Sequence, residues 1–582
     1  MSQSKSTELH QAVLELSPKL KRAAWFTLCS SLLVLAPSIY MLEVYDRVVG
    51  SRNHMTLAML TIAVLGAFVV MEILEWARGA ILHDAGVDLD RKLGARVFNA
   101  IFTANLKRLP GGSTQPMSDF RMVREFLASP VVAAVMEAPS SLVFLVVVFL
   151  INPYLGWVSI LGALIQVGVG WANERGTKPP LAAANKSAFA AQQYADSTLR
   201  NAQVIESMGM LKDIHRRWME KQREFLGLQA LASERAGGYQ AVMKFLQVMM
   251  SSLLLGLGAW LLLHNLLNGG GGMMIVGSIL GGRILTPLVQ VVANWRSVIN
   301  FRESWGRLEL LLATVPPKAQ AMELPQPKGM LHVDNLMAGA PGSNIPILRG
   351  VNFALRPGEV LAVIGPSASG KTTLARLLTG LWPAVSGKVR LDGADVYTWN
   401  KSELGPHVGY LPQGVELFDG TLAENIARFG ETETHKVEAA AKAVGLHEYI
   451  MALPQGYDSA VGREGAMLSG GQRQRVGLAR AIYGDPAFVV LDEPNSSLDD
   501  AGDAALASAI VELKSRGTTF VVMTHRTSIL PVVDKLLLLR DGQVQAFGPR
   551  DEVLAAMNKA AAQAHQAQQQ HAAAAPQALA AA

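Results

Sequence analysis

In the C-terminal half, residues 359–372 read Glu359-Val360-Leu361-Ala362-Val363-Ile364-Gly365-Pro366-Ser367-Ala368-Ser369-Gly370-Lys371-Thr372. The start of this stretch has the pattern of a buried strand, and the apolar spacing after it is that of a helix. The glycine loop between them has the spacing of a P-loop. Glycines let backbone N–H groups crowd around phosphate oxygens, and the helix N-terminus adds positive potential. We therefore expect Lys371 to bind the β- and γ-phosphates of a nucleotide and the Thr372 hydroxyl to reach Mg²⁺.

A second buried strand, at residues 488–492, ends in two neighbouring carboxylates, Asp492 and Glu493. An acidic pair alone is a weak signal, because many strands end in acids. It becomes a strong one about 120 residues after a P-loop. We expect Asp492 to hold Mg²⁺ through water, and Glu493 to be the base that polarises the attacking water.

Another predicted helix opens with the motif Leu468-Ser469-Gly470-Gly471-Gln472. This motif resembles the signature of the ABC ATPase superfamily, and the resemblance covers nearly the whole chain. It implies that the loop binds the γ-phosphate of ATP held by the opposite subunit. Hydroxyl and N–H groups at a helix N-terminus form a suitable anion site. Since one chain has one P-loop and one signature, two chains would close two composite sites as a homodimer.

Three further motifs match the same superfamily. Residues 410–413 resemble the Q-loop, whose Gln413 would contact Mg²⁺ and water and sense the membrane domain. Residues 496–499 resemble the D-loop that crosses the dimer interface, and His525 resembles the switch histidine at the γ-phosphate. A lone histidine is more often structural, but its place after the strand at residues 520–523 favours the functional interpretation.

One departure from the superfamily pattern concerns the residue that contacts the base of the nucleotide. The superfamily usually has an aromatic residue that stacks on adenine, and its expected place falls near Ala340. Residues 336–341 contain no aromatic side chain. Base stacking is therefore expected to be weaker or supplied from elsewhere, and nucleotide selectivity stays open.

Together these motifs predict three sets of site residues. The set that binds ATP is Gly365, Pro366, Ser367, Ala368, Ser369, Gly370, Lys371, Thr372, Thr373, Ser469, Gly470, Gly471, Gln472 and Asp499. The set that holds Mg²⁺ is Thr372, Gln413 and Asp492. The catalytic set is Glu493, His525 and Gln413.

The N-terminal half is dominated by apolar segments long enough to cross a lipid bilayer, which takes about 20 helical residues. Six of them span residues 23–42, 55–77, 131–151, 154–172, 245–267 and 273–294. The first contains Pro37, which membrane helices tolerate. Basic residues precede it as in a signal peptide, but no small-residue cleavage site follows, so we expect an uncleaved first helix.

The connections between these segments differ in their number of basic residues. Residues 78–130 hold eight Lys or Arg and residues 173–244 hold eleven, whereas the connections after the third and fifth segments hold none. Basic loops face the cytoplasm, so both long loops and both chain ends are expected there. The long loops have helical apolar spacing, with breaks near Gly111 and Gly209, and are predicted to continue the spans as helices.

The predicted fold class is a six-helix α transmembrane exporter domain followed by an α/β P-loop ABC ATPase domain. The expected divisions are a cytoplasmic N-terminal segment (1–22), the transmembrane domain (23–312), a proline-containing linker (313–329), the nucleotide-binding domain (330–554) and an Ala- and Gln-rich tail (555–582). Hydrophobic residues make up 50% of the 582 residues, and the single Cys29 excludes an intrachain disulfide. The formal charge of +5 suggests basic residues beside a membrane rather than a nucleic-acid surface.

Three stretches of the membrane domain look like those of type I protein-secretion ATPases: residues 36–48, 200–210 and 272–290. Few residues precede the first span, which leaves no room for a peptidase-like domain. The chain is therefore most similar to the branch that exports metalloproteases, lipases, haemophores and surface-layer proteins. The resemblance implies ATP-driven export of an unfolded protein with an uncleaved C-terminal signal across the bacterial inner membrane. It also implies two partners, a periplasmic adaptor protein and an outer-membrane channel.

Two alternatives remain open at the level of sequence. One is a half-transporter for lipid, drug or peptide, and the other is a membrane ATPase that acts as a sensor or scaffold without cargo. Arg283 also has two interpretations, because an ionised side chain inside a membrane span is costly. It either lines a polar path for the transported polypeptide or makes an ion pair or carbonyl contact that fixes helix packing.

Overall fold

The computed structural model describes residues 8–267, 270–317, 323–341, 345–462, 465 and 467–559. The chain divides near Pro317 into two compact units, an N-terminal unit of helices and a C-terminal α/β unit. Residues 1–7 of the expected N-terminal segment, 318–322 of the linker and 560–582 of the tail lie outside the described residues.

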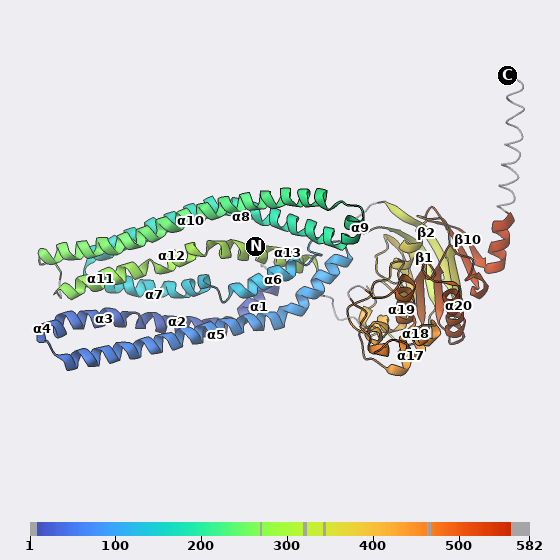
Figure 1. The fold of residues 1–582 in the computed structure, drawn as a ribbon, viewed down its shortest axis with the longest axis horizontal. Coiled ribbons are helices and arrows are strands. Elements are labelled where there is room, and N and C mark those ends of the chain that lie inside the picture. The colour runs from blue at the N-terminus through green and yellow to red at the C-terminus, as the bar shows by residue number, and fades with distance from the viewer. Residues whose placement is uncertain are drawn as a thin grey trace, which may run out of the picture. The chain divides into compact units, whose positions relative to one another are not determined.

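The N-terminal unit is built from long helices that lie side by side (Figure 1). Its helices are α1 (Glu8–Glu15), α2 (Ser17–Leu33), α3 (Leu35–Glu43), the π-helix η1 (Val44–Val48), α4 (Val49–Ser51), α5 (His54–Leu106), α6 (Gln115–Phe126), α7 (Pro130–Ile151), α8 (Pro153–Arg200), α9 (Ala202–Ser207), α10 (Leu211–Leu263), α11 (Gly270–Ile284), α12 (Thr286–Ala293) and α13 (Trp295–Thr314). In the described part of the chain, six helical segments are long and apolar enough to cross a membrane. Helices α5, α8 and α10 run far beyond their apolar windows, so the long loops do continue the spans as helices.

Proline explains two of the interruptions. α2 ends at Leu33, whose carbonyl oxygen would normally accept from the N–H four residues later, at Pro37. α11 ends at Ile284 in the same way, because Pro287 has no N–H for the carbonyl oxygen of Arg283. The segments expected at 23–42 and 273–294 therefore each consist of two consecutive helices, which together form one candidate span, Ser17–Glu43 and Gly270–Ala293.

Several helix ends in the structure differ from the bounds of the expected segments. The first membrane helix begins at Ser17 rather than at residue 23, because Pro18 suits the first turn of a helix and the lysines after it do not stop one. The fifth ends at Leu263 rather than at residue 267. The last helix of the unit, α13, continues past residue 312 to Thr314.

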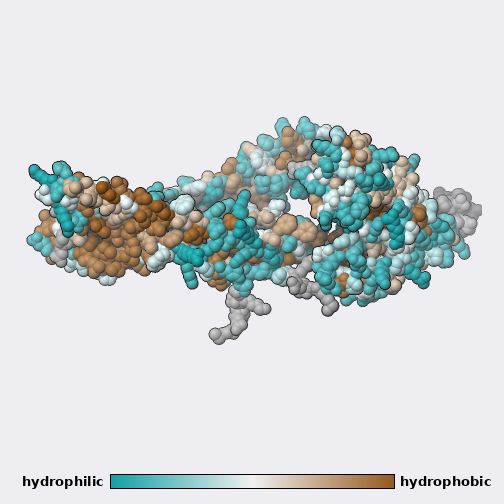
Figure 2. Space-filling model, turned by 90° about the horizontal axis from the view of Figure 1, so that it is seen from below, coloured by the Kyte–Doolittle hydropathy of each residue, from teal (hydrophilic) through white to brown (hydrophobic). Residues whose placement is uncertain are grey.

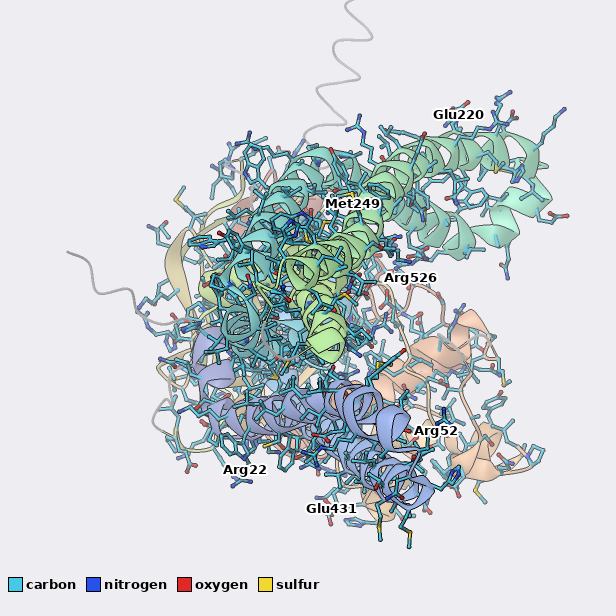
Figure 3. The ribbon with its side chains drawn as sticks, turned by 90° about the vertical axis from the view of Figure 1, so that its left-hand side faces the viewer. Arg22, Arg52, Glu220, Met249, Glu431 and Arg526 are labelled. Atoms are coloured by element: carbon cyan, nitrogen blue, oxygen red, sulfur yellow. The ribbon has the colours of Figure 1, made fainter. Side chains whose placement is uncertain are left out.

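Exposed apolar side chains mark the part of the N-terminal unit that suits a lipid environment. The apolar window of α5 has no buried residue, and Met59, Ile62 and Val69 are among its exposed side chains. On the face in Figure 2, brown surface gathers over one part of this unit. Figure 3 views the helices end-on and places Met249 of α10 among its neighbours, whereas Glu220 lies on the projecting part of the same helix. A patch of this size is expected where lipid covers the surface.

The C-terminal unit contains two sheets. Its strands are β1 (Leu331–Gly339), β2 (Pro346–Leu355), β3 (Val360–Ile364), β4 (Ser386–Leu391), β5 (Ala394–Asp395), β6 (Val408–Leu411), β7 (Phe488–Asp492), β8 (Thr519–Met523), β9 (Lys535–Arg540) and β10 (Gln543–Pro549). The order β2-β1-β4-β5 forms an antiparallel sheet. The order β10-β9-β3-β8-β7-β6 forms the central sheet, which is parallel except for β10.

Helices cover the central sheet. They are α14 (Lys371–Leu378), α15 (Lys401–Leu404), α16 (Leu422–Ile426), α17 (Thr434–Ala443), α18 (His447–Met451), α19 (Gly470–Ile482) and α20 (Asp500–Ser515), with short 3-10 turns η2 (Gly405–His407), η3 (Gly456–Asp458) and η5 (Leu530–Val532). Successive residues of β3 point to opposite faces, so Val360 and Ala362 join one core cluster and Leu361 and Val363 the other. Residues 550–559 are helical.

Candidate active site and polar cavity

Four neighbouring parallel strands bring the predicted catalytic motifs to one edge of the central sheet. In the order β3-β8-β7-β6, their carboxyl ends lead into the P-loop, His525, Glu493 and Gln413. Parallel strands all end at the same edge, and such edges are where α/β sheets bind ligands. Residues that are up to about 160 positions apart in the chain therefore become neighbours, since His525 is 160 positions after Gly365.

The P-loop is shaped by backbone conformations that few side chains allow. Gly370 has φ 103° and caps α14, and a Cβ atom there would lie 2.7 Å from Leu348 Cδ2. Ala368 adopts a left-handed φ of 65°. Lys371 is buried, and its Nζ donates to the carbonyl oxygens of Gly365 at 2.9 Å and Pro366 at 3.0 Å. The loop thus curls around the ammonium group of Lys371 at the start of a helix, as a phosphate cradle requires.

The carboxylate of Asp492 fits a cation. Asp492 is 1% exposed, and neither carboxylate oxygen has a hydrogen-bond partner within the described residues. Burial raises the pKa of Asp492, and the nearby Thr372 hydroxyl opposes part of that rise. The described residues contain no cluster of three or more His, Cys, Asp or Glu that would form an all-protein metal site. One orphaned carboxylate beside a hydroxyl and a phosphate cradle matches how Mg²⁺ is bound, with few protein ligands and substrate phosphates supplying the rest.

The three predicted catalytic residues meet at the ends of β6, β7 and β8. Gln413 Nε2 donates to Glu493 Oε2 at 3.1 Å, and His525 Nδ1 lies 3.6 Å from Glu493 Oε1. Glu493 has a left-handed φ of 54°, and its N–H donates to the carbonyl oxygen of Met523 on the neighbouring strand. A non-glycine residue in this region is strained, and such strain gathers at functional sites. The arrangement holds the carboxylate between an amide and an imidazole, where it can orient a water molecule.

The signature residues form a second group. Ser469 Oγ accepts from the Gln472 N–H and Gln472 Oε1 accepts from the Ser469 N–H, which is a capping box at the start of α19. The Gln472 side chain therefore forms its hydrogen bond within the signature loop. A Cβ atom on Gly471 would lie 3.0 Å from the carbonyl oxygen of Ser497, so glycine allows this close approach.

Asp499 belongs to the same group. It accepts from the N–H of Gly502 at 3.0 Å and from Arg475 at 2.6 Å, which together hold the pKa of its carboxyl below the usual range. In the described part of one chain, no hydrogen bond joins this group to the P-loop.

Sequence reasoning missed Gln474, which touches the backbone of Glu493. The helical spacing of α19 places Gln474 on one stripe with Gly477, Leu478 and Ala481, all buried. A polar side chain that begins an otherwise apolar stripe is the signal that would have found it, because buried polar groups need partners.

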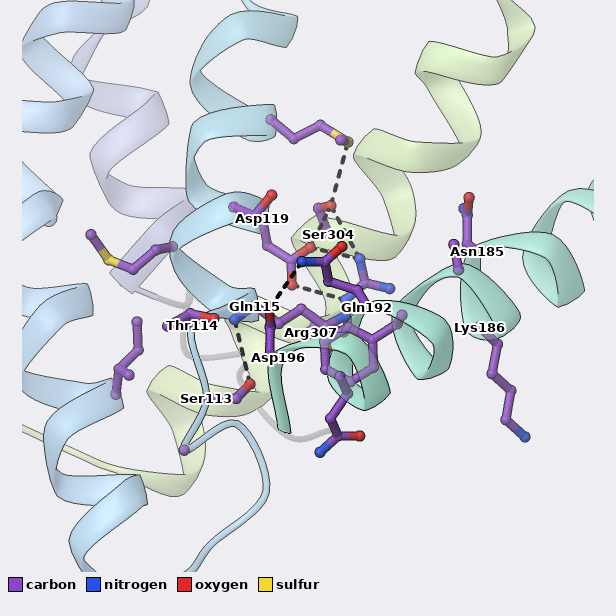
Figure 4. Close-up of a pocket in the computed structure, with 18 of the residues that line it drawn as sticks. Ser113, Thr114, Gln115, Asp119, Asn185, Lys186, Gln192, Asp196, Ser304 and Arg307 are labelled. Carbon is purple, nitrogen blue, oxygen red and sulfur yellow. Dashed lines mark hydrogen bonds and ion pairs between the residues drawn. The ribbon is translucent and has the colours of Figure 1, made fainter. Parts of the chain in front are cut away.

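The N-terminal unit has a separate polar cavity of about 1400 Å³ between α5, α6, α8 and α13 (Figure 4). Its lining mixes aromatic side chains such as Phe102 and Phe189 with polar and charged ones such as Lys186 and Asp196. Amides and hydroxyls make up much of the remainder: Asn105, Ser113, Thr114, Gln115, Ser118, Asn185, Gln192, Gln193, Ser197, Asn201 and Asn300. Such a wall can bind peptide groups and varied side chains without selecting one ligand shape.

An ion pair fixes one side of this cavity. Asp119 of α6 is 4% exposed and accepts from Ser304 Oγ at 2.9 Å. It also accepts from Arg307 Nε at 2.9 Å and Nη2 at 2.6 Å. The hydrogen bonds to Asp119 raise the pKa of Arg307 above its usual range. These contacts join α6 to α13 across the cavity wall (Figure 4).

Arg283, within the last membrane segment, is exposed in the single chain. Within the described residues it makes no ion pair and its side chain makes no hydrogen bond. The interpretation of Arg283 as a residue that fixes helix packing requires such a partner, and the single chain does not supply one.

Comparisons with known proteins agree with this arrangement. A family model described as "ABC transporter transmembrane region" matches residues 23–280, and one described as "ABC transporter" matches residues 348–496. The chain is 41% identical to the type I secretion system ATP-binding protein PrsD of Rhizobium meliloti, over 90% of each chain. It is 27% identical to the toxin RTX-I translocation ATP-binding protein of Actinobacillus pleuropneumoniae, over 90% of this chain and 74% of the relative.

A solved structure shows the same fold. It is described as a bacterial Atm1-family ABC exporter with ATP bound, and it matches with a TM-score of 0.79 at 21% identity, covering 93% of this chain and 97% of the other. At this identity the likeness establishes the fold alone. The six membrane-crossing segments, the ATP-binding unit and the full-length relative lead to one conclusion: the chain belongs to the ABC transporter family, among the ATP-binding proteins of type I secretion systems.

Proposed function

We propose that this chain is the ATP-hydrolysing exporter of a type I secretion system in the bacterial inner membrane. It acts as a homodimer, keeps its ATPase unit in the cytoplasm and moves an unfolded protein that has a C-terminal secretion signal. The observation that supports this most is the full-length relative, 41% identical, which is itself a type I secretion ATP-binding protein. The branch that exports metalloproteases, lipases, haemophores and surface-layer proteins remains our expectation for the cargo.

In the proposed ATP site the P-loop residues 365–373 bind the phosphates through backbone N–H groups and Lys371. Asp492 and Thr372 hold Mg²⁺, with Gln413 beside them; the ion supplies positive charge that neutralises the phosphate oxygens. The orphaned carboxylate of Asp492 supports this assignment.

Glu493 acts as the general base that orients the attacking water and takes its proton. Its contacts with Gln413 and His525 support this role, because they hold the carboxylate oxygens in a fixed direction. His525 in turn senses the γ-phosphate. The signature residues Ser469, Gly470, Gly471 and Gln472, together with Asp499, complete the site of the second subunit. Their separation from the P-loop of the same chain supports this role.

The polar cavity is the proposed entrance for the polypeptide. Its size and its mixture of amides, hydroxyls, charges and aromatic rings suit an unfolded segment that must bind without a defined shape. Arg283 continues this path within the bilayer, where an exposed cation requires a polar surrounding. A periplasmic adaptor protein and an outer-membrane channel receive the cargo.

ATP binding and transport are coupled if ATP binds one arrangement of the dimer better than another. We propose that the segments 111–121 and 204–211 transmit closure of the ATPase units to the spans. Hydrolysis through Glu493 then resets the dimer.

Two rival functions give different outcomes in the same experiment. The chain is reconstituted with adaptor and channel candidates from its own cell, and secretion of proteins with and without their C-terminal segments is measured. Signal-dependent secretion supports the proposal. Transport of lipid, drug or short peptide without adaptor or channel would favour a half-transporter of another class, and ATP turnover without any transport would favour a sensor or scaffold.

The catalytic assignment has its own test in purified protein in nanodiscs. Glu493→Gln is expected to trap an ATP-bound dimer, because the amide cannot accept a proton from water. Phosphate release by this variant at the wild-type rate would contradict the role of Glu493, whatever the cargo.

A further inference from the structure

Gln474 makes four hydrogen bonds to the segment that contains the catalytic carboxylate. It is 4% exposed. Its Nε2 donates its two hydrogens to the carbonyl oxygens of Glu493 at 3.1 Å and Pro494 at 2.5 Å, and its Oε1 accepts from Ser496 Oγ at 3.4 Å. Its Oε1 accepts from the N–H of Ser497 at 2.8 Å. One buried side chain thus contacts four of the residues from 493 to 497.

The direction of the Gln474 amide follows from its partners. Two of them are carbonyl oxygens, which only accept, and one is a backbone N–H, which only donates. A reversed amide would place its oxygen against two carbonyl oxygens and its NH₂ group against the Ser497 N–H. The amide therefore cannot be exchanged for a group that only accepts or only donates without leaving buried partners unsatisfied.

These hydrogen bonds reach a strained residue. Glu493 has a φ of 54°, a region in which L-residues crowd their own carbonyl oxygen. Its N–H is fixed by the carbonyl oxygen of Met523, and its own carbonyl oxygen accepts from Gln474 and from the N–H of Ser496 at 3.2 Å. The contact with Gln474 is thus part of what keeps the Glu493 backbone in this conformation. The backbone in turn aims the side chain at Gln413.

The other end of the link is the signature loop. Gln474 lies in α19, whose first turn is capped by Ser469 and contains Gly470 and Gly471. Gly471 also lies against the carbonyl oxygen of Ser497, the residue whose N–H donates to Gln474 Oε1. A displacement of the first turn of α19 therefore moves the same backbone segment that carries Glu493.

We propose that Gln474 is a positioning residue that links the signature loop to the catalytic carboxylate of the same chain. The inference rests on the proposed roles of Glu493 and of the homodimer. In the dimer the signature loop of one chain meets the nucleotide of the second chain, whereas Glu493 acts on the nucleotide of its own chain. Gln474 therefore transmits nucleotide binding at one composite site to the base at the other.

The test uses the full-length dimer in nanodiscs and two substitutions. Gln474→Met keeps the length of the side chain and removes all its hydrogen bonds, and Gln474→Glu keeps the acceptor for Ser497 but removes both donors. The matched control is Gln455→Met, because Gln455 is exposed and lies outside the site. The measurements are kcat, KM for ATP, the Hill coefficient for ATP and the thermal midpoint.

Both Gln474 variants are expected to lower kcat about tenfold or more, the factor that corresponds to the loss of one or two net hydrogen bonds. KM for ATP stays within about twofold, because the P-loop is unchanged. The Hill coefficient is expected to be above 1 in the wild type and to fall to about 1 in the variants, since the link between the sites is broken. Gln455→Met behaves as wild type.

Several results would overturn the inference. A wild-type kcat in Gln474→Met and Gln474→Glu would do so, as would a loss of ATP binding in parallel with kcat in both, which would indicate general loss of structure. A Hill coefficient of 1 in the wild type would refute the link between sites. The variant Glu493→Gln distinguishes failure of this inference from failure of the proposed function. If Glu493→Gln is inactive while the Gln474 variants are normal, the role proposed for Gln474 is wrong and the proposed function stands.

Discussion

The ion pair between Asp119 and Arg307 gives a prediction in which the two partners are not equivalent. The Asp119 side chain is 6% exposed, whereas that of Arg307 is 42% exposed. The consequence of removing either partner depends on where the remaining charge is left. We compare Asp119→Asn, Arg307→Met and the double variant.

Asp119→Asn leaves a guanidinium group that can turn towards water, so its cost is limited to the lost charge-assisted hydrogen bonds, about 1–2 kcal/mol after rehydration. Arg307→Met leaves a carboxylate in a buried place with the Ser304 hydroxyl as its remaining donor. An uncompensated buried charge costs about 3–5 kcal/mol. Removing the arginine is thus expected to be worse by about 2 kcal/mol. The double variant regains most of this difference, because no buried charge remains.

The assay is the thermal midpoint of the purified full-length protein at one fixed scan rate. Unfolding of a large membrane protein is not two-state, so the order of the midpoints is compared rather than free energies. We expect wild type highest, then Asp119→Asn and the double variant, then Arg307→Met.

The double variant supplies the decisive check, because it removes both charges together and leaves no buried carboxylate without its arginine. Equal midpoints for the two single variants, or a double variant as low as Arg307→Met, would refute this reasoning.

Three other predictions concern the ATP site and the membrane path. Glu493→Gly should melt higher than Glu493→Ala, because glycine relieves a left-handed conformation that costs about 1–2 kcal/mol in other residues; calorimetry that ranks alanine first would contradict this. Asp492→Asn should raise the midpoint without nucleotide, since it removes a buried charge that lacks hydrogen bonds, and should abolish the additional rise caused by Mg²⁺ and ATP in the same scan. Arg283→Ala should leave the midpoint unchanged but lower secretion in the reconstituted system; a clear fall in the midpoint would instead indicate a packing role.

The sequence was sufficient for features that depend on neighbours in the chain. The P-loop, the Asp492–Glu493 strand end and the signature are each contiguous motifs, and their residue types are dictated by phosphate and metal chemistry. The six membrane segments are likewise visible as local apolar runs, and the breaks near Gly111 and Gly209 follow from local turn signals. The residue types that each of these features requires are neighbours in the chain, so the pattern is visible without knowledge of the fold.

Helix ends were less predictable from the sequence. An apolar window shows where a helix meets lipid, but it does not show where the helix stops, because charged residues such as those after Pro18 continue a helix as well as apolar ones do. The divisions after Leu33 and Ile284 depend on a missing proline N–H, which the sequence contains but which membrane helices often tolerate without a break.

Contacts between residues far apart in the chain could not be predicted from the sequence and became visible in the folded chain. The order β3-β8-β7-β6 places Gln413 and His525 on either side of Glu493, and no periodicity along the chain encodes that order. The four hydrogen bonds of Gln474 and the pairing of Asp119 with Arg307 are of the same kind. Sequence patterns indicate which side of a helix or strand is buried. The partner on the buried side depends on crossovers and packing between elements far apart in the chain.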